Sequence, residues 1–242
     1  MKTKSIMIIS VLIIFIIISA TLIYFLLDAN KKDDVEEPEN NYFMSYSYAG
    51  GWSPYSYAEV NITGTNAIVS LKMINSDDII AERQLSDEFV NEMIGKYLEM
   101  DFFNMEIDDI FVFDVGRTTI SFEYNNMNRT ITYIRVENEN LTNITSMFWK
   151  IISQEEYLNY LEDYKNLDNS SLVGKLSGLS ADIRNEKILD PDEFIPIFKE
   201  MILNEENRDT YGYWALDCLA EIRGEVFDGD FDLALKWIGE NY

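Results

Sequence analysis

Residues 56–100 read SYAEVNITGTNAIVSLKMINSDDIIAERQLSDEFVNEMIGKYLEM, in which strand signals give way to a helix signal. Two β-rich runs meet at Gly64-Thr65, which favours a hairpin turn. The run IIAERQL, at 79–85, is a third candidate strand. The apolar residues that follow change to helical spacing. Strands and a helix within one short stretch indicate the α+β class.

The helix expected over residues 86–100 has clear start signals. Ser86 is a good N-cap, and Leu85 can pack on Val90 as a hydrophobic staple. Acidic residues in the first turn suit the positive end of the helix dipole. Apolar side chains then recur at helical spacing, so that one face of the helix can cover a sheet. These residues are Val90, Met93, Ile94, Tyr97 and Leu98.

An antiparallel sheet domain covered by helices is expected over residues 42–165. Two alternating runs, 118–124 and 129–136, flank Asn125-Asn126-Met127-Asn128, which predicts a second hairpin. The spacing of apolar residues then predicts a further helix over Leu141–Leu161.

Residues 166–242 are expected to form a second region that is entirely helical. Four amphipathic segments follow one another with brief polar connections: SSLVGKLSGLSADIRNEKI, DEFIPIFKEMILNEE, TYGYWALDCLAEIRG and FDLALKWIGENY. They resemble HEAT-like helical hairpins, and two hairpins are too few to stand alone, so they should pack on the sheet domain or on a partner. Asp190 and Glu193 have capping-box spacing, whereas Pro196 implies that this helix is kinked or begins later.

The first 27 residues predict a transmembrane anchor. The run from Ser5 to Leu27 contains no charged residue, and it spans about 34 Å as a helix, enough to cross a hydrocarbon core of about 30 Å. Its length exceeds the apolar stretch of a cleaved signal peptide. Residues 28–41 are charged and lack apolar periodicity, which indicates a short tether.

The orientation expected for this single-pass protein places the soluble region outside the cytoplasm, at the cell membrane. Lys2 and Lys4 precede the hydrophobic run, and positive charge favours the cytoplasmic side. Five Asn-x-Ser/Thr sequons agree with that placement and are candidate glycosylation sites. They are Asn61, Asn128, Asn140, Asn143 and Asn169. The alternative is a scaffold that faces the cytoplasm.

The composition excludes several classes of function. The formal net charge is −24, and such a chain repels nucleic acid, which binds through cations on the protein. The chain has no histidine, so triads and zinc sites that need histidine are excluded. The single cysteine, Cys218, shares a helical face with apolar residues and is interpreted as a buried packing residue. No catalytic set and no cofactor are expected.

A dense aromatic stretch around Gly50-Gly51 is the best candidate for a recognition surface. Exposed tyrosine and tryptophan on a glycine-rich loop could stack on sugars or anchor a protein partner. The candidate residues are Tyr46, Tyr48, Trp52 and Tyr55. The alternative is that these residues alternate along a strand and that half of the rings belong to the core.

Two groups of acidic residues need separate comment. Asp228, Asp230 and Asp232 have the spacing of a calcium loop, but the expected glycine and the final glutamate of an EF-hand are missing. The competing interpretation is that Asp228 or Asp230 caps the last helix. Adjacent carboxylates such as Glu155 and Glu156 are expected by chance in a chain with 43 acidic residues.

One resemblance covers residues 43 to about 155. The succession YSYAGGWSPYSYAEVNITG, LSDEFVNEMIGKYLEMDFF and VFDVGRTTISFEYNNMNRTITY resembles an extracytoplasmic α+β domain of unknown function in prokaryotic membrane-attached proteins, and it points to an archaeal source. The resemblance implies no catalytic residues. The expected function is a non-enzymatic, membrane-tethered binding module with a protein or glycan partner. The alternative is a calcium-responsive or carbohydrate-active surface protein.

Overall fold

The structure is a computed structural model that describes residues 42–50, 55–74, 77–107, 116–134, 138–205 and 208–242. The hydrophobic run of residues 5–27 and the tether are outside these ranges. Within them, no helix is both long enough and apolar enough to cross a membrane. Residues 42–242 group together as one unit, and all structural statements below concern this unit.

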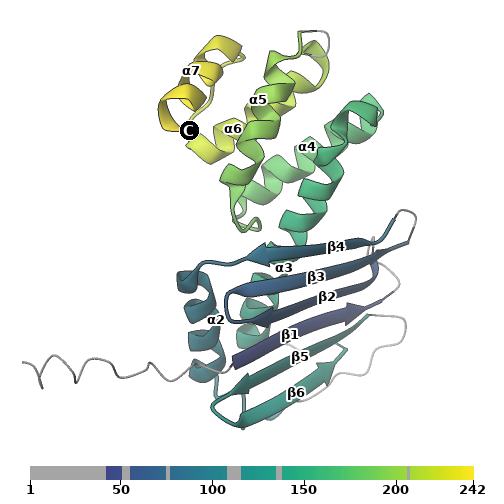
Figure 1. Ribbon diagram of the computed structural model, residues 1–242, viewed down its shortest axis with the longest axis vertical. Coiled ribbons are helices and arrows are strands. Elements are labelled where there is room, and N and C mark those ends of the chain that lie inside the picture. Colours follow the sequence, from purple (N-terminus) through teal and green to yellow (C-terminus); the bar gives the residue numbers. More distant parts are fainter. Residues whose placement is uncertain (1–41, 51–54, 75–76, 108–115, 135–137, 206–207) are drawn as a thin grey trace, which may run out of the picture. The chain divides into compact units, whose positions relative to one another are not determined.

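Six antiparallel strands form one sheet in the order β4-β3-β2-β1-β5-β6 (Figure 1). Both predicted hairpins are confirmed. Gly64 has a φ of 57°, and Asn125 and Asn126 have φ values of 49° and 64°, the left-handed conformations that tight two-residue hairpin turns use. The strands are β1 (Tyr42–Ala49), β2 (Tyr55–Thr63), β3 (Asn66–Met73), β4 (Ile79–Gln84), β5 (Arg117–Tyr124) and β6 (Met127–Tyr133).

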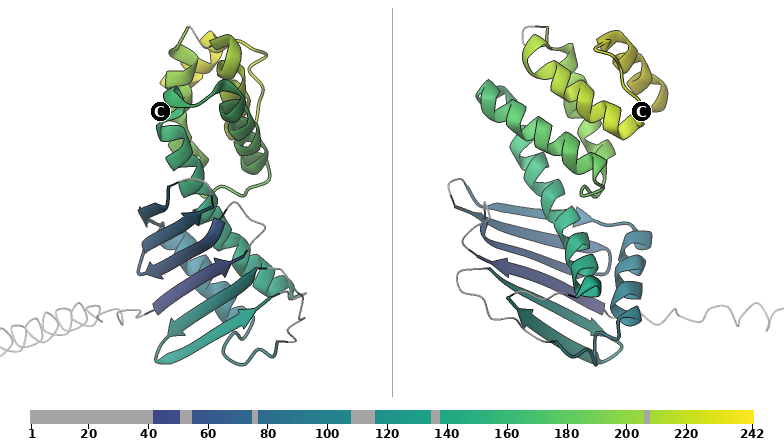
Figure 2. Two further views of the ribbon diagram at one scale, coloured as in Figure 1. Left: turned by 90° about the vertical axis from the view of Figure 1, so that its right-hand side faces the viewer. Right: turned by 180° about the vertical axis from the view of Figure 1, so that it is seen from behind.

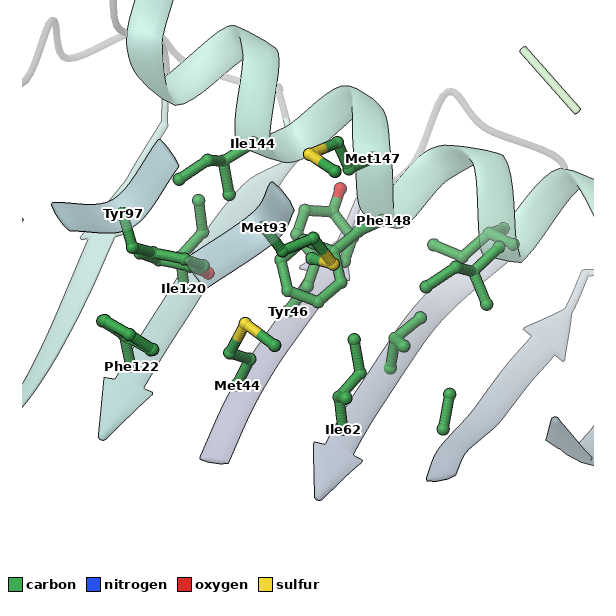
Figure 3. Packing of buried hydrophobic residues seen from close by; sticks show 14 of the residues in the cluster. Met44, Tyr46, Ile62, Met93, Tyr97, Ile120, Phe122, Ile144, Met147 and Phe148 are labelled. Carbon is green, nitrogen blue, oxygen red and sulfur yellow. The ribbon is translucent and has the colours of Figure 1, made fainter. Parts of the chain in front are cut away.

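Two helices, α2 (Asp87–Glu99) and α3 (Glu139–Glu162), cover one face of this sheet (Figure 2). The predicted cap of α2 is confirmed, because the Ser86 side chain accepts a hydrogen bond from the Phe89 amide at 3.1 Å. Asn138 caps α3 in the same way. Alternate residues of the strands point at these helices and form a dry core (Figure 3). Its largest fully buried side chains include Met44, Tyr46, Ile62, Met93, Tyr97, Phe102, Phe122 and Phe148.

Helix α3 continues from the sheet into a second, helical cluster (Figure 2). The sheet cluster ends at Ile152 on this helix, and the helical cluster begins at Tyr157. The border between the two cores therefore falls inside α3. The other helices are α4 (Asn169–Arg184), α5 (Ile195–Leu203), α6 (Tyr213–Arg223) and α7 (Phe231–Asn241), and α6 contacts the other three.

The irregular start of α5 resolves the question raised by Pro196. A 3-10 turn, η3 (Pro191–Phe194), comes first, and α5 begins only at Ile195, so Pro196 lies in the first helical turn, where no hydrogen bond is lost. The α+β class is confirmed. Cys218 is fully buried, and burial raises the pKa of its thiol far above the ordinary value.

Candidate binding groove along strand β4

Strand β4 is an edge strand, because β3 is its one neighbour among the described strands. The backbone N–H of Leu85, just after β4, donates to the carbonyl of Thr65 at 2.7 Å. Hydrogen-bonding groups alternate in direction along an antiparallel strand. Leu85, Arg83 and Ala81 therefore direct their backbone groups toward β3. The residues between them, and Ile80, direct their N–H and C=O groups away from the sheet; Glu82 is one of these residues.

A groove of about 430 Å³ runs beside β4, between this strand, the second half of α3 and α5. Its walls are largely apolar, and carboxylates stand among them. Ile80 contributes to it, and 78% of this residue is exposed. The lining residues used below are Ile79, Leu158, Tyr164, Ile197, Glu162 and Glu200.

A second depression, of about 480 Å³, lies where β2, β3 and β4 meet. Tyr57, Lys72 and Asp78 contribute to it, and the Lys72 ammonium group is 5.8 Å from the centre of the Tyr57 ring. Ile79 and Ile80 line both hollows. Successive side chains of a strand point to opposite faces, so β4 has space on each of its two sides.

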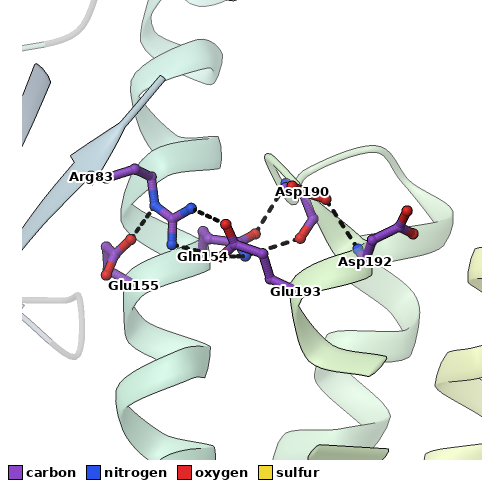
Figure 4. Close-up of polar contacts among 6 residues, drawn as sticks. All are labelled: Arg83, Gln154, Glu155, Asp190, Asp192 and Glu193. Carbon is purple, nitrogen blue, oxygen red and sulfur yellow. Dashed lines mark hydrogen bonds and ion pairs between the residues drawn. The ribbon is translucent and has the colours of Figure 1, made fainter. Parts of the chain in front are cut away.

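A polar cluster fixes the C-terminal end of β4 against the helices (Figure 4). The Arg83 side chain is only 10% exposed, and its Nε donates to Glu155 of α3. Its Nη1 and Nη2 donate to the two carboxylate oxygens of Glu193 at 2.7 and 2.9 Å. Burial opposes the charge of Arg83, but the hydrogen bonds to both glutamates outweigh burial and raise its pKa. One guanidinium thus joins the sheet, α3 and the turn before α5.

Gln154 completes this cluster from a fully buried position on α3. Its carbonyl oxygen accepts from the Asp190 amide at 3.2 Å, and its amide nitrogen donates to the Asp190 carbonyl and to Glu193, both at 3.0 Å. The hydrogen bond from Arg83 lowers the pKa of Glu193, whereas burial raises the pKa of Asp190. The turn that leads into α5, one wall of the groove, is therefore held by directional bonds.

The neighbouring residue, Glu156, forms a second link between the two cores. Its carboxylate accepts a hydrogen bond from the Tyr55 hydroxyl of β2 and pairs with Lys175 of α4 at 2.6 Å. The adjacent glutamates of α3 thus have different partners, and both are engaged in ion pairs. These ion pairs give a structural reason for the adjacent Glu155 and Glu156, which the sequence alone attributed to chance.

Tyr164 is the one groove residue with an unsatisfied buried polar atom among those the structure describes. Its side chain is 4% exposed, and its hydroxyl has no hydrogen-bond partner in the described part of the chain. Burial, with the nearby charge of Glu200, raises the pKa of Tyr164 to about 12, so the hydroxyl stays protonated at neutral pH. A buried hydroxyl without a hydrogen-bond partner is unfavourable for stability.

The predicted aromatic surface is not assembled as expected. Tyr46 and Tyr55 are 1% and 3% exposed, and the Tyr46 ring stacks on Phe148 with centroids 5.3 Å apart. Tyr48 is half-buried against Trp149. Strand alternation turns these rings toward α3, so they belong to the core instead of to an exposed surface. Trp52 is not among the described residues.

The acidic loop before α7 has a structural role. Asp230 caps α7 by accepting a hydrogen bond from the Leu233 amide at 2.9 Å, as one interpretation of the sequence predicted. Asp228 and Asp232 are exposed. Among the described residues, no three acidic or cysteine side chains are arranged to hold a metal ion.

Four of the five sequons present an exposed asparagine. Asn128 is the second residue of β6, Asn140 and Asn143 lie in the first two turns of α3, and Asn169 is the first residue of α4. Asn61 is half-buried in the middle of β2. Glycosylation at these positions stays a prediction.

Sequence analysis did not identify Arg83 or Gln154 as site residues. One signal for Arg83 was present: in the run IIAERQL, strand alternation places it on the same side as Ile79 and Ala81. A charged residue on the covered face of a strand requires a buried partner. Its partner Glu193 is 110 positions away, so local patterns could not identify it.

Comparison with known proteins adds no assignment to this geometry. No protein-family model matches the chain. A search of curated proteins also gives no match. The resemblance to an extracytoplasmic α+β domain therefore stays a prediction.

Proposed function

We propose that this protein is a membrane-tethered, extracytoplasmic binding module and that its ligand site is the groove along β4. The observation that carries the proposal is an open strand edge beside a largely apolar hollow of about 430 Å³. Hollows of this kind, with a few polar groups among apolar walls, are typical of binding sites. The polar cluster around Arg83 supports the proposal, because it keeps β4 and the start of α5 in fixed positions.

A binding role agrees better with the state of the groove carboxylates than a hydrolytic one. Glu155 is paired with Arg83, and Glu200 is paired with Lys165. Glu162 has no ion pair within the described residues, so the groove does not bring together two unpaired carboxylates, as glycoside hydrolysis requires. We therefore propose a non-enzymatic module in which helices α4–α7, arranged as HEAT-like hairpins, support one wall of the site.

The proposed location rests on the uncharged run of residues 5–27. Such a run favours lipid over water, and the positive charge at Lys2 and Lys4 favours a cytoplasmic N-terminus. Full-length protein should sediment with membranes and need detergent for release. In intact cells, added protease should digest the soluble region. Recovery in the aqueous fraction would refute the anchor, and protection from protease would favour the cytoplasmic scaffold.

The proposed site can be tested in cells that make the full-length protein. A photo-crosslinking amino acid at position Leu158, inside the groove, should form adducts with another protein. The same amino acid at Lys236, exposed on α7, is the matched control and should give none. Equal adducts at both positions, or none at either, would exclude the groove as the binding site.

A further inference from the structure

We infer that the groove takes an extended, cationic peptide segment of a partner protein, which pairs with β4 as a seventh strand of the sheet. This inference rests on the proposed function and specifies its ligand. The backbone of β4 is suited to pairing with a further strand. Ile80 and Glu82 direct N–H and C=O groups outward, and an added strand would satisfy these groups by regular ladder bonds. The six residues of β4 span about 20 Å, enough for a short peptide to pair.

Hollows on the two faces of this edge provide space for the side chains of an added strand. Side chains of an added strand would alternate between the groove next to α3 and α5 and the depression next to Tyr57 and Lys72. The groove offers Ile79, Leu158 and Ile197 to apolar side chains.

The negative charge around this edge selects among possible occupants. The groove is bordered by Glu162, for which the described part of the chain provides no ion pair. The other depression is bordered by two acids, Glu59 and Asp78, and by one cation, Lys72. The whole chain carries a net charge of −24. A second copy would bring the same charge to the edge, and the tether of residues 28–41 is rich in acids. The negative electrostatic potential of this surface attracts a cationic segment, and binding of that segment neutralises part of the charge.

The test uses full-length protein in nanodiscs of uncharged lipid and a labelled probe peptide, acetyl-Lys-Val-Lys-Ile-Lys-Val-Lys-amide. Two control peptides carry N-methyl groups, one on every lysine amide and the other on every valine and isoleucine amide. In a paired strand, alternate residues direct their N–H groups toward the neighbour. One methylated peptide should therefore lose binding while the other keeps it. Equal effects of the two sets would overturn strand addition, as would tighter binding of a peptide with glutamate in place of lysine.

Two variants locate the peptide on the protein. Ile80→Pro removes an outward N–H and leaves the β3 ladder intact, which edge strands tolerate, and it should weaken binding by about tenfold or more. Asp78→Lys reverses an exposed charge at the depression, which the lysines of the probe face when its valine and isoleucine side chains fill the groove, and it should weaken binding by about tenfold. Glu99→Lys makes the same charge change on α2, away from the groove, and is the matched control. An equal loss in both lysine variants would mean that the peptide senses only net charge, which overturns the inference.

The outcomes separate this inference from the proposed function. If the crosslinker at Leu158 captures a protein but the peptide tests fail, the binding module stands and strand addition is wrong. If crosslinking fails as well, both are wrong. Dimers of the full-length protein that disappear in the Ile80→Pro variant would show that a second copy occupies the edge, which also overturns a cationic partner.

Discussion

The two halves of helix α3 are held in different ways. The first half packs on the sheet through apolar side chains such as Ile144, Phe148 and Ile151, all fully buried. The second half contacts its surroundings through Gln154, Glu155 and Glu156 as well as through apolar residues. Hydrophobic burial is strong but has no preferred direction, whereas hydrogen bonds to charged groups are directional. The comparison teaches that burial fixes the helix on the sheet, while polar contacts set the position of the groove walls.

The largest expected effect follows from removing burial in the first half. Phe148→Ala deletes a ring that is fully buried and stacked on Tyr46, so we expect a loss of about 3–5 kcal/mol in the free energy of unfolding. Urea denaturation of the full-length protein in detergent measures this loss. Hydrogen exchange should increase first in β1 and β5, which line that core.

Phe198→Ala is the matched control in the helical cluster, because this ring is also fully buried. It should cost a similar free energy, but exchange should increase first in α5 and α6. If Phe148→Ala instead loosened the helical cluster and left the sheet unchanged, the division of α3 into two halves would be wrong.

The next effect concerns the polar contacts of the second half. Glu155→Ala leaves the nearly buried guanidinium of Arg83 with Glu193 as its remaining partner, and we expect a loss of about 2–3 kcal/mol. The double variant Arg83→Met with Glu155→Leu removes both charges and keeps the volume. Glu193 loses its guanidinium partner but is 38% exposed and keeps the hydrogen bond from Gln154, so the double variant should recover stability to within about 1 kcal/mol of the parent. A double variant as unstable as Glu155→Ala would show that packing, and not the unpaired charge, accounts for the loss.

The same double variant bears on the groove. If the polar cluster positions the turn before α5, the variant should fold but bind the probe peptide more weakly. Unchanged peptide binding would show that the apolar contacts alone place the groove walls.

Local signals explain how much of this structure was predictable. Ser86 as a cap, the turn at Gly64-Thr65 and the later start of α5 all depend on residues within a few positions of each other. The pairing of Arg83 with Glu193 depends on how α3 carries the helical part past the edge of the sheet. The groove depends on the same arrangement, so neither could be read from local patterns. The prediction of an exposed aromatic surface was wrong for Tyr46 and Tyr55, because β1 and β2 place these side chains on the covered face of the sheet.

Caps give a smaller effect that can be compared between the two regions. Ser86→Ala removes the cap of α2 on the sheet side, and Asp230→Ala removes the cap of α7 on the helical side. Each should cost about 1 kcal/mol, because one backbone N–H loses its partner. Hydrogen exchange should increase in the first turn of the affected helix only. A spread of the effect across both cores would mean that the two regions are coupled more tightly than the separate clusters indicate.

The smallest effect is a pH dependence located at Glu193. The hydrogen bond from Arg83 lowers the pKa of Glu193 below its ordinary value of 4.5, so ionised Glu193 stabilises the fold above that value. This stabilisation is lost as the pH falls through the lower pKa of the folded state. Because the side chain is 38% exposed, Glu193→Gln should cost less than about 1 kcal/mol near neutral pH. The difference between the two proteins should shrink as the pH is lowered from about 6 to about 3.

Burial raises the pKa of Asp190, and the charge of Glu193 raises it further, so both proteins should carry Asp190→Asn to remove this contribution of opposite sign. Repeating the comparison in an Arg83→Met background provides the control, because Glu193 then has no guanidinium to pair with. In that background, the pH-dependent effect of Glu193→Gln should be much smaller, because only the hydrogen bond from Gln154 is left to lower the pKa of Glu193. If the pH dependence persisted without Arg83, another group would be responsible for it. The directional contact between β4 and the turn before α5 would then contribute nothing measurable, and burial alone would have to position both halves of α3.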